Sequence, residues 1–169
     1  MDFAKLSAER YSLRKFSDRP VEGEKLDLVL EAGRNAPTAH NLQPQRIFVL
    51  QTPEALEKAD GCTAAHFHPP VILVVAYDPE AAWKRETDGK NHGEIDAAIA
   101  ATQMMLQAAD LGLGTTYVAM WACLSLKSCW RLSRRWRDCA PSPCCLWATR
   151  QRAPIPPAST RTGSPWRSW

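Results

Sequence analysis

This chain of 169 residues lacks the segments that would mark a membrane or secreted protein. It contains no run of 18 or more apolar residues, so we expect no transmembrane helix and no membrane partner. The first ten residues show no basic stretch followed by an apolar run, so we expect no secretory signal and a cytoplasmic location. The length favours one domain with a core of its own.

Acidic residues are nearly absent from the last part of the chain. Residues 122–169 contain nine basic residues and one acid, Asp138, for a net charge of +8, whereas residues 1–121 contain 12 basic and 17 acidic residues, for −5. The overall charge of +3 therefore describes neither part and does not indicate nucleic-acid binding by the whole chain. The Trp and Arg residues of the tail could stack on single-stranded nucleic acid or lie at an anionic membrane, but no motif or amphipathic period supports either.

Metal-site and disulfide patterns are also missing. Five of the six cysteines lie after residue 121, and they show no C-x-x-C spacing: Cys123, Cys129, Cys139, Cys144 and Cys145. We therefore expect neither a structural zinc site nor, without a secretory signal, disulfides. His66 and His68 could place two imidazoles on one side of a strand, but no cluster of carboxylates or cysteines completes a metal site.

Residues 1–121 contain alternating helical and extended patterns. Apolar spacing predicts helices over 24–35, 53–59 and 94–111, and β-branched or apolar runs predict strands over 46–50, 71–77 and 115–120. The run over 71–77 is almost continuously apolar, which is typical of a strand buried on both faces. This alternation favours an α/β or α+β sandwich. After residue 121 no period is sustained, and prolines interrupt any long element.

Arg10-Tyr-Ser-Leu-Arg14 is the first candidate binding motif. Two guanidinium groups that flank a hydroxyl suit a phosphate, because arginine donates charge-assisted and often bidentate hydrogen bonds. A short basic stretch on a solvated surface is the alternative interpretation.

Two further motifs lie in loops. Ala36-Pro-Thr-Ala-His-Asn-Leu-Gln-Pro44 separates a predicted helix from a strand, and its amides suit heterocycle edges and polyols, although a self-satisfied turn is the alternative. The glycines of Leu111-Gly-Leu-Gly-Thr115 would let backbone N–H groups approach a flat ligand, although a helix cap before a strand explains them equally well.

Together, in order and spacing, these three motifs resemble the FMN-dependent nitroreductase family across about residues 3–120. The stretch from Asp88 to Asp96 also resembles the loop-to-helix entry of small bacterial members. The resemblance implies an α+β sandwich with an antiparallel-rich central sheet flanked by helices.

The same resemblance implies a non-covalent FMN site at a homodimer interface. Its residues fall into three groups: Arg10, Tyr11, Ser12 and Arg14 at the phosphate and ribityl end; Pro37, Thr38, Asn41 and Gln43 in a loop that generally serves the partner's flavin; and Leu113 and Gly114 near the isoalloxazine ring. Because the cofactor supplies the chemistry, we assign no side chain as acid, base or nucleophile.

The implied activity is that of an NAD(P)H-dependent FMN oxidoreductase. Electrons would pass from NAD(P)H through flavin N5 to a nitroaromatic, quinone or similar small-molecule acceptor by a ping-pong mechanism. The alternatives are an FMN-fold protein with another reaction, such as reductive dehalogenation, and an inactive remnant or binding module whose basic tail meets an acidic partner.

The tail departs from the family pattern after about residue 120. Members typically continue with an Asp-Pro-containing helix, a basic residue that helps to hold the phosphate and an acidic close, whereas here Trp, Cys, Arg and Pro rise together. That set is typical of GC-rich coding DNA read out of frame. We therefore predict a C-terminally incomplete FMN-binding domain over 1–120 and a frameshifted, disordered tail over 121–169, with a genuine lineage-specific tail as the alternative.

Overall fold

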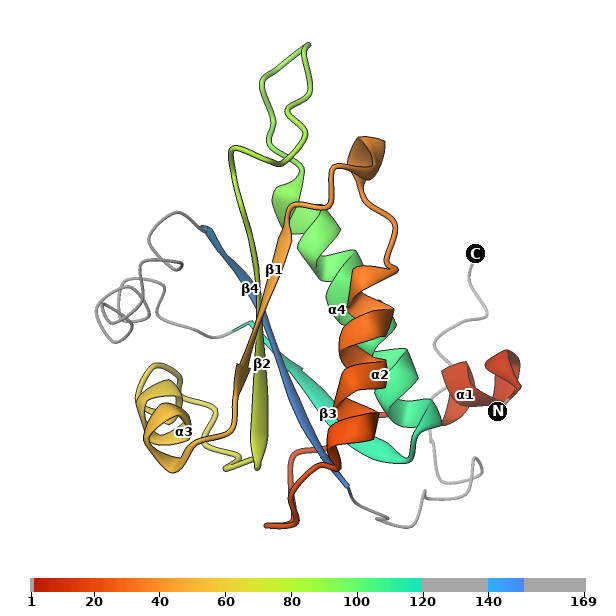
Figure 1. Cartoon of the computed structure of the whole chain (residues 1–169), viewed down its shortest axis with the longest axis vertical. Helices are drawn as coiled ribbons and strands as arrows, with labels where there is room; N and C mark the ends of the chain where they lie inside the picture. The colour runs from red at the N-terminus through yellow and green to blue at the C-terminus, as the bar shows by residue number, and fades with distance from the viewer. Residues whose placement is uncertain (1, 120–139, 151–169) are drawn as a thin grey trace, which may run out of the picture.

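The computed structural model describes residues 2–119 and 140–150. Figure 1 shows the order of the elements along this part of the chain. The helices are α1 (Phe3–Glu9), α2 (Gly23–Arg34), the short 3-10 helix η1 (Ala39–Asn41), α3 (Pro53–Asp60) and α4 (Gly93–Asp110). The strands are β1 (Gln45–Leu50), β2 (Val71–Tyr77), β3 (Leu113–Val118) and β4 (Ala140–Arg150).

The four strands form one sheet in the order β1-β2-β4-β3, with antiparallel pairing throughout. β4 comes last in the sequence but lies between β2 and β3, as the blue arrow in Figure 1 shows. Its register against β2 shifts between Val75 and Ala76, opposite Cys144 and Pro141. Proline cannot donate a ladder hydrogen bond, so an irregularity of this kind is where a sheet accommodates it.

β4 falls within the tail for which composition predicts disorder. For residues 140–150 the structure differs from that expectation, because their backbone pairs with a strand on each side. Every residue except proline has the same backbone N–H and C=O groups, so strands can pair through backbone hydrogen bonds even where the side chains show no alternating pattern. Residues 120–139 and 151–169, and the prediction about them, lie outside the described part of the chain.

Most of the predicted elements of residues 24–120 are confirmed within one to two residues. The strand over 71–77 is found with these bounds and is buried on both faces, while the third strand begins and ends two residues earlier than expected. Local chemistry explains several boundaries: Thr52 caps α3 by accepting from the Ala55 N–H at 3.3 Å, and Pro53 opens that helix. Helix α1 was not predicted, since its seven residues bury only Leu6.

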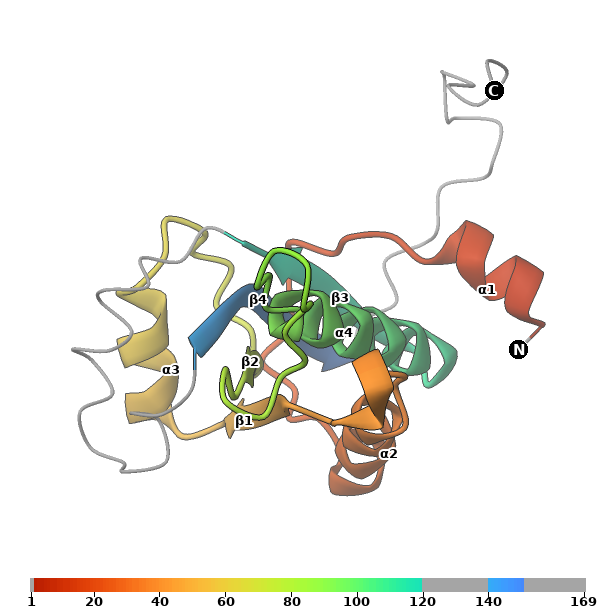
Figure 2. The ribbon, with the colours of Figure 1, turned by 90° about the horizontal axis from the view of Figure 1, so that it is seen from above.

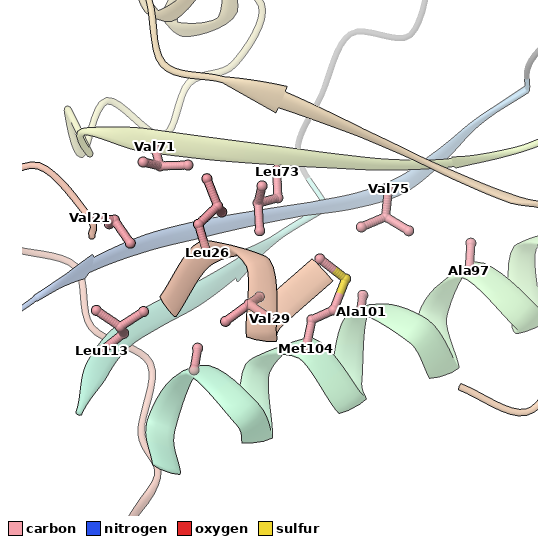
Figure 3. Close-up of a cluster of buried hydrophobic side chains, with 11 residues drawn as sticks. Val21, Leu26, Val29, Val71, Leu73, Val75, Ala97, Ala101, Met104 and Leu113 are labelled. Carbon is pink, nitrogen blue, oxygen red and sulfur yellow. The ribbon is translucent and has the colours of Figure 1, made fainter. Parts of the chain in front are cut away.

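Helices α2 and α4 cover one face of the sheet, and α3 covers the other (Figure 2). Side chains alternate across β2, so that Val71, Leu73 and Val75 point to the helix pair (Figure 3) while Ile72 and Val74 point to the opposite core. The helix-pair core is completed by Val21, Leu26, Val29, Ala97, Ala101, Met104, Ala108 and Leu113, and the opposite core by Leu50, Ala59, Cys62 and Val118. The predicted α+β sandwich with an antiparallel sheet is thus confirmed. No helix among the described residues is long and apolar enough to cross a bilayer.

Candidate functional site

The N-terminal motif is fixed against the beginning of β3. Ser12 forms a parallel bridge with Thr115, and the Leu13 N–H donates to the Thr115 carbonyl oxygen at 2.9 Å. The Leu13 side chain fills the space beside Gly114, where a Cβ atom would lie 2.3 Å from Leu13 Cδ2. The structure therefore brings together the motif over 10–14 and residues 113–114, two of the three groups predicted to bind the cofactor.

Two polar groups in this region are buried and have no hydrogen-bond partner among the described residues. They are Nη1 of the half-buried Arg10 and Oγ1 of Thr115, which is 3% exposed. Leaving such donors unpaired costs free energy, and a guanidinium N–H binds an anionic oxygen most strongly. Tyr11 and Ser12 are half-buried beside them, and Arg14 is exposed. These donors fit a phosphate group.

The third predicted group lies at the other end of the helix pair. The Ala39 N–H donates to Asp96 Oδ1 at 2.9 Å, and Asp96 lies in the first turn of α4, whereas Leu113 follows the last turn. At 1.5 Å per residue, the length of α4 between these points is roughly 20 Å. Figure 1 shows the separation, with η1 near the upper end of α4 and the start of β3 near its lower end. Within one chain the loop over 37–43 is therefore not brought together with the other two groups.

The loop itself has an unusual backbone. His40, Asn41 and Gln43 have φ values of 52°, 54° and 49°, in the left-handed region that residues with a side chain rarely adopt. Two hydrogen bonds are internal to the loop: Asn41 N–H donates to the Thr38 carbonyl at 2.9 Å, and Gln43 N–H donates to Thr38 Oγ1 at 3.0 Å. Pro37, Asn41 and Gln43 are exposed and Thr38 is half-buried, so the amide side chains can reach a ligand outside the loop.

Sequence reasoning missed the neighbours that hold this loop. The His40 ring stacks on Trp83, with ring centroids 5.0 Å apart, and Trp83 contacts His92 at 4.7 Å. Asp96 is 2% exposed, and the sequence did not predict it as a site residue. A signal for Asp96 was present, because it stands four residues before Ala100 and eight before Met104, in line with the buried stripe of α4. No spacing in the sequence links His40 with Trp83.

The start of α4 is seated against the end of β2. Gly93 leaves room for the Tyr77 ring, since a Cβ atom there would lie 2.1 Å from Tyr77 Cδ2. Burial raises the pKa of Tyr77, and the charge of Glu94 raises it further, so the phenol stays neutral at physiological pH. This packing fixes the helical turn that carries Asp96.

A short hairpin beside the loop contains an ion pair. Arg85 Nε donates to Asp88 Oδ1 at 2.8 Å, a second bond joins Arg85 Nη2 to Asp88 Oδ2, and the Lys90 N–H donates to Oδ1 at 3.1 Å. The Arg85 hydrogen bonds, and after them the Lys90 N–H, lower the pKa of Asp88 from 3.8 to about 2. Because the pKa is lowered by folding, the pair stabilises the hairpin fully above about pH 4 and loses this effect as the pH falls toward 2.

We therefore expect the Asp88 carboxyl group to titrate near pH 2 in the folded protein. Arg85→Ala should move the midpoint up toward 3.8, because the dominant hydrogen bonds are lost. Carboxyl ¹³C chemical shifts measured against pH test both statements. Lys84→Ala is the matched control, since Lys84 lies next to Arg85 but pairs with Glu80 at 3.4 Å; a midpoint that Lys84→Ala raises as much as Arg85→Ala would contradict this assignment.

The two histidines considered as metal ligands do have a carboxylate beside them. Asp60 Oδ2 lies 2.8 Å from His66 Nδ1, and Asp60 Oδ1 lies 3.7 Å from His68 Nδ1. No sequence pattern indicates this contact, which forms between the end of α3 and the start of β2. Asp60 and His68 line a cavity of about 580 Å³, together with Asp18, Leu56 and Val71.

An apolar groove of about 550 Å³ runs along the outer face of α4. Pro37, Ile95, Ala98, Ile99 and Leu106 line it, and Ile95 and Ile99 are 42% and 38% exposed. Large apolar side chains that stand together on an exposed face are typical of a surface that contacts another protein. The groove is thus a candidate interface next to the loop over 37–43.

Comparison with known proteins identifies the family. The sequence model of the nitroreductase family matches residues 8–67 and 57–138. The chain belongs to the nitroreductase family. The match confirms the resemblance that the three motifs predicted, and it runs past residue 120, where we expected the resemblance to end. The frameshift stays a prediction.

Individual relatives agree with this family assignment. The chain is 31% identical over 125 residues to an NADH dehydrogenase from Thermus thermophilus, a match that covers 72% of this chain and 61% of that protein. It is 31% identical over 120 residues to an FMN reductase [NAD(P)H] from Bacillus subtilis, covering 62% of this chain and 48% of that one. The chain therefore spans less than two thirds of the length of these curated nitroreductase relatives.

Solved structures show the same fold. A nitroreductase family protein from Clostridium difficile is 34% identical with a TM-score of 0.84, and the match covers 92% of this chain and 87% of that one. An FMN-dependent nitroreductase from the same species has a TM-score of 0.73 at 24% identity, with 89% and 88% covered. At that identity the second match is an argument for the fold only.

Proposed function

We propose that this nitroreductase-family chain binds FMN and acts as an oxidoreductase that passes reducing equivalents from NAD(P)H to a small-molecule acceptor, such as a nitroaromatic or a quinone, by a ping-pong mechanism. The observation that carries the proposal is Arg10 Nη1, which has no hydrogen-bond partner in the part of the chain that the structure describes and lies on the segment that is bridged to the start of β3. The relative from Bacillus subtilis that is named FMN reductase [NAD(P)H] supports the choice of cofactor. Bound FMN would accept a hydride from the nicotinamide and deliver electrons to the acceptor.

The chain's own residues would bind and orient this cofactor. Arg10 and Arg14 would neutralise the phosphate, with Tyr11 and Ser12 beside them, because guanidinium groups form the strongest hydrogen bonds to phosphate oxygens. Backbone groups of Leu113 and Gly114 would meet the isoalloxazine ring, where the bridge between Ser12 and Thr115 fixes the distance between the two segments. No side chain needs to act as acid, base or nucleophile in this scheme.

The position of the loop over 37–43 favours a homodimer. Thr38, Asn41 and Gln43 lie one length of α4 away from the phosphate donors of the same chain, so they can complete a flavin site only on a second copy. The groove that Ile95 and Ile99 line lies beside the loop and offers the apolar surface that a dimer would bury.

Reconstitution with FMN tests the proposed function. The purified chain, incubated with FMN and freed of excess by gel filtration, should carry the visible absorption of flavin and quench its fluorescence. It should then oxidise NADH or NADPH when a quinone or nitroaromatic is present. A colourless protein that FMN cannot reconstitute would contradict the proposal and favour the inactive remnant.

Ile99→Glu should prevent dimer formation and release FMN. A carboxylate in the centre of the apolar groove would lose its hydration on association, and the partner's loop would no longer reach the flavin. Analytical ultracentrifugation should show the variant as a monomer at concentrations where the unaltered chain is a dimer. Leu28→Glu is the control, because Leu28 is 50% exposed but on α2 and outside the groove. An unaltered chain that is strictly monomeric and keeps its flavin would contradict the two-chain site.

A further inference from the structure

The loop over 37–43 has a costly backbone conformation. His40, Asn41 and Gln43 all have φ near 50°, and such residues persist only where the surroundings fix them. Strain of this kind is characteristic of ligand-binding segments that are formed before the ligand arrives. The contacts that hold the loop are therefore part of the site, even where they touch no ligand.

One contact ties the loop to the rest of the fold across 57 residues of sequence. Asp96 Oδ1 accepts the Ala39 N–H at 2.9 Å, at the first residue of η1. From there the internal bonds continue, since Leu42 N–H donates to the Ala39 carbonyl at 3.2 Å. On the outer side the stack of His40 on Trp83 covers the turn. Asp96 is thus the buried anchor from which the left-handed turn is built.

The choice of an aspartate here is expensive for stability alone. Asp96 is 2% exposed, and its second oxygen, Oδ2, is buried without a hydrogen-bond partner among the described residues. A buried carboxylate with one unpaired oxygen is destabilising, and the N-terminus of α4 offsets only part of this cost. An apolar residue at position 96 would extend the buried face of α4 that contains Ala100 and Met104, without the cost of a buried charge.

We propose that Asp96 is a positioning residue for FMN: by accepting the Ala39 N–H, it holds the loop that carries Thr38, Asn41 and Gln43 in its binding geometry before the cofactor arrives. This inference rests on the proposed function, because it takes that loop to contact flavin. Asp96 itself contacts neither the cofactor nor the reacting atoms. Its effect is on the fraction of chains whose loop can bind.

If fewer chains have the loop in its binding geometry, the association rate constant for FMN falls, whereas the dissociation rate constant stays unchanged. Two variants with side chains of similar size distinguish the effect of the hydrogen bond from the effects of side-chain volume and charge. Asp96→Leu fills the space without an acceptor, and Asp96→Asn keeps an acceptor oxygen without the charge. We expect Asp96→Leu to lower the association rate constant for FMN about ten-fold, with a matching rise in Kd and an unchanged dissociation rate constant. Asp96→Asn should stay within about two-fold of the unaltered protein. Stopped-flow quenching of FMN fluorescence measures these rates.

Hydrogen exchange supplies a readout that does not depend on the cofactor. In the apo protein, Asp96→Leu should raise the exchange rates of the Asn41, Leu42 and Gln43 amides about ten-fold, because the turn that protects them is no longer anchored. Asp96→Asn should leave these rates nearly unchanged, and amides of α2 should be unaffected in both. Asp96→Ala repeats the measurements should the leucine variant not fold.

Glu24→Ala is the control for charge, because Glu24 also lies in the first turn of a helix, α2, but is exposed. It should change neither the rates of FMN binding nor the exchange of the loop. The inference is overturned when Asp96→Leu leaves loop exchange unchanged, when the asparagine variant is as slow as the leucine variant, or when only dissociation is faster. Failure of the proposed function looks different: the unaltered chain then binds no FMN, and Arg10→Ala has nothing to weaken, while loop exchange still shows whether Asp96 positions the loop.

Discussion

Replacing Arg10 by alanine should weaken FMN binding by about 1.5–3 kcal/mol, which is the range for a hydrogen bond to a charged group. The expected rise in Kd is roughly ten- to hundred-fold. Arg10 Nη1 is buried and has no hydrogen-bond partner among the described residues, so a phosphate would satisfy it rather than replace an existing partner. Fluorescence titration of the apo protein with FMN measures the effect.

Arg14 provides the companion variant and Arg34 the control. Arg14 is exposed, so Arg14→Ala should fall at the lower end of the same range because water screens its charge. Arg34 on α2 has a side chain that is 75% exposed and pairs with Glu31 at 3.0 Å, so Arg34→Ala should leave FMN affinity unchanged. If neither Arg10→Ala nor Arg14→Ala weakens FMN binding, the assignment of the phosphate site is wrong.

Leu73→Ala should destabilise the fold by about 2–5 kcal/mol, the usual cost of removing a large buried aliphatic side chain. Leu73 is 1% exposed and lies on β2 facing Val29 and Met104, where the sheet meets the helix pair (Figure 3). The cavity would open beneath both helices that position the candidate site. Urea denaturation followed by circular dichroism, at a fixed protein concentration, measures the free energy of unfolding.

Leu28→Ala is the matched control for this prediction. Leu28 is 50% exposed on α2, so its truncation removes little buried surface and should change the free energy of unfolding by no more than about 0.5 kcal/mol. Equal effects of the two substitutions would show that the core of the protein does not lie between β2 and the helix pair. The residual fold of Leu73→Ala should also bind FMN more weakly, since α2 and α4 carry the loop between them.

Local sequence patterns predicted most elements because their causes are local. The apolar run of β2 and the periodic stripe of α4 follow from side-chain spacing alone, and Pro37 and Thr52 mark helix boundaries through backbone chemistry. Helix α1 was missed because one buried leucine is too weak a periodic signal. β4 was missed because its partners, β2 and β3, lie far away in the sequence and no alternating pattern marks it.

The candidate site was likewise predicted in part, by its residue types but not by their arrangement. The residue types of the three motifs were sufficient for a family resemblance, and they indicated a phosphate group and a planar ring as ligands. Their arrangement was not predictable, since it depends on a parallel bridge between Ser12 and Thr115 and on a loop at the far end of α4. No local pattern links His40 with Trp83, and the buried stripe of α4 places Asp96 in the core without indicating that it binds Ala39.

By itself, then, the sequence determined the α+β class, the bounds of most elements between residues 24 and 118, the family, and the residue types that could hold a cofactor. Only the tertiary structure decided that residues 10–14 meet the start of β3, that residues 37–43 lie one helix length away, and that Asp96 anchors that loop. The physical reason is the range of the interactions. Helix and strand patterns arise from neighbours within a few residues, whereas a binding site is made by contacts such as the one from Ala39 to Asp96, which form only after the whole chain has packed.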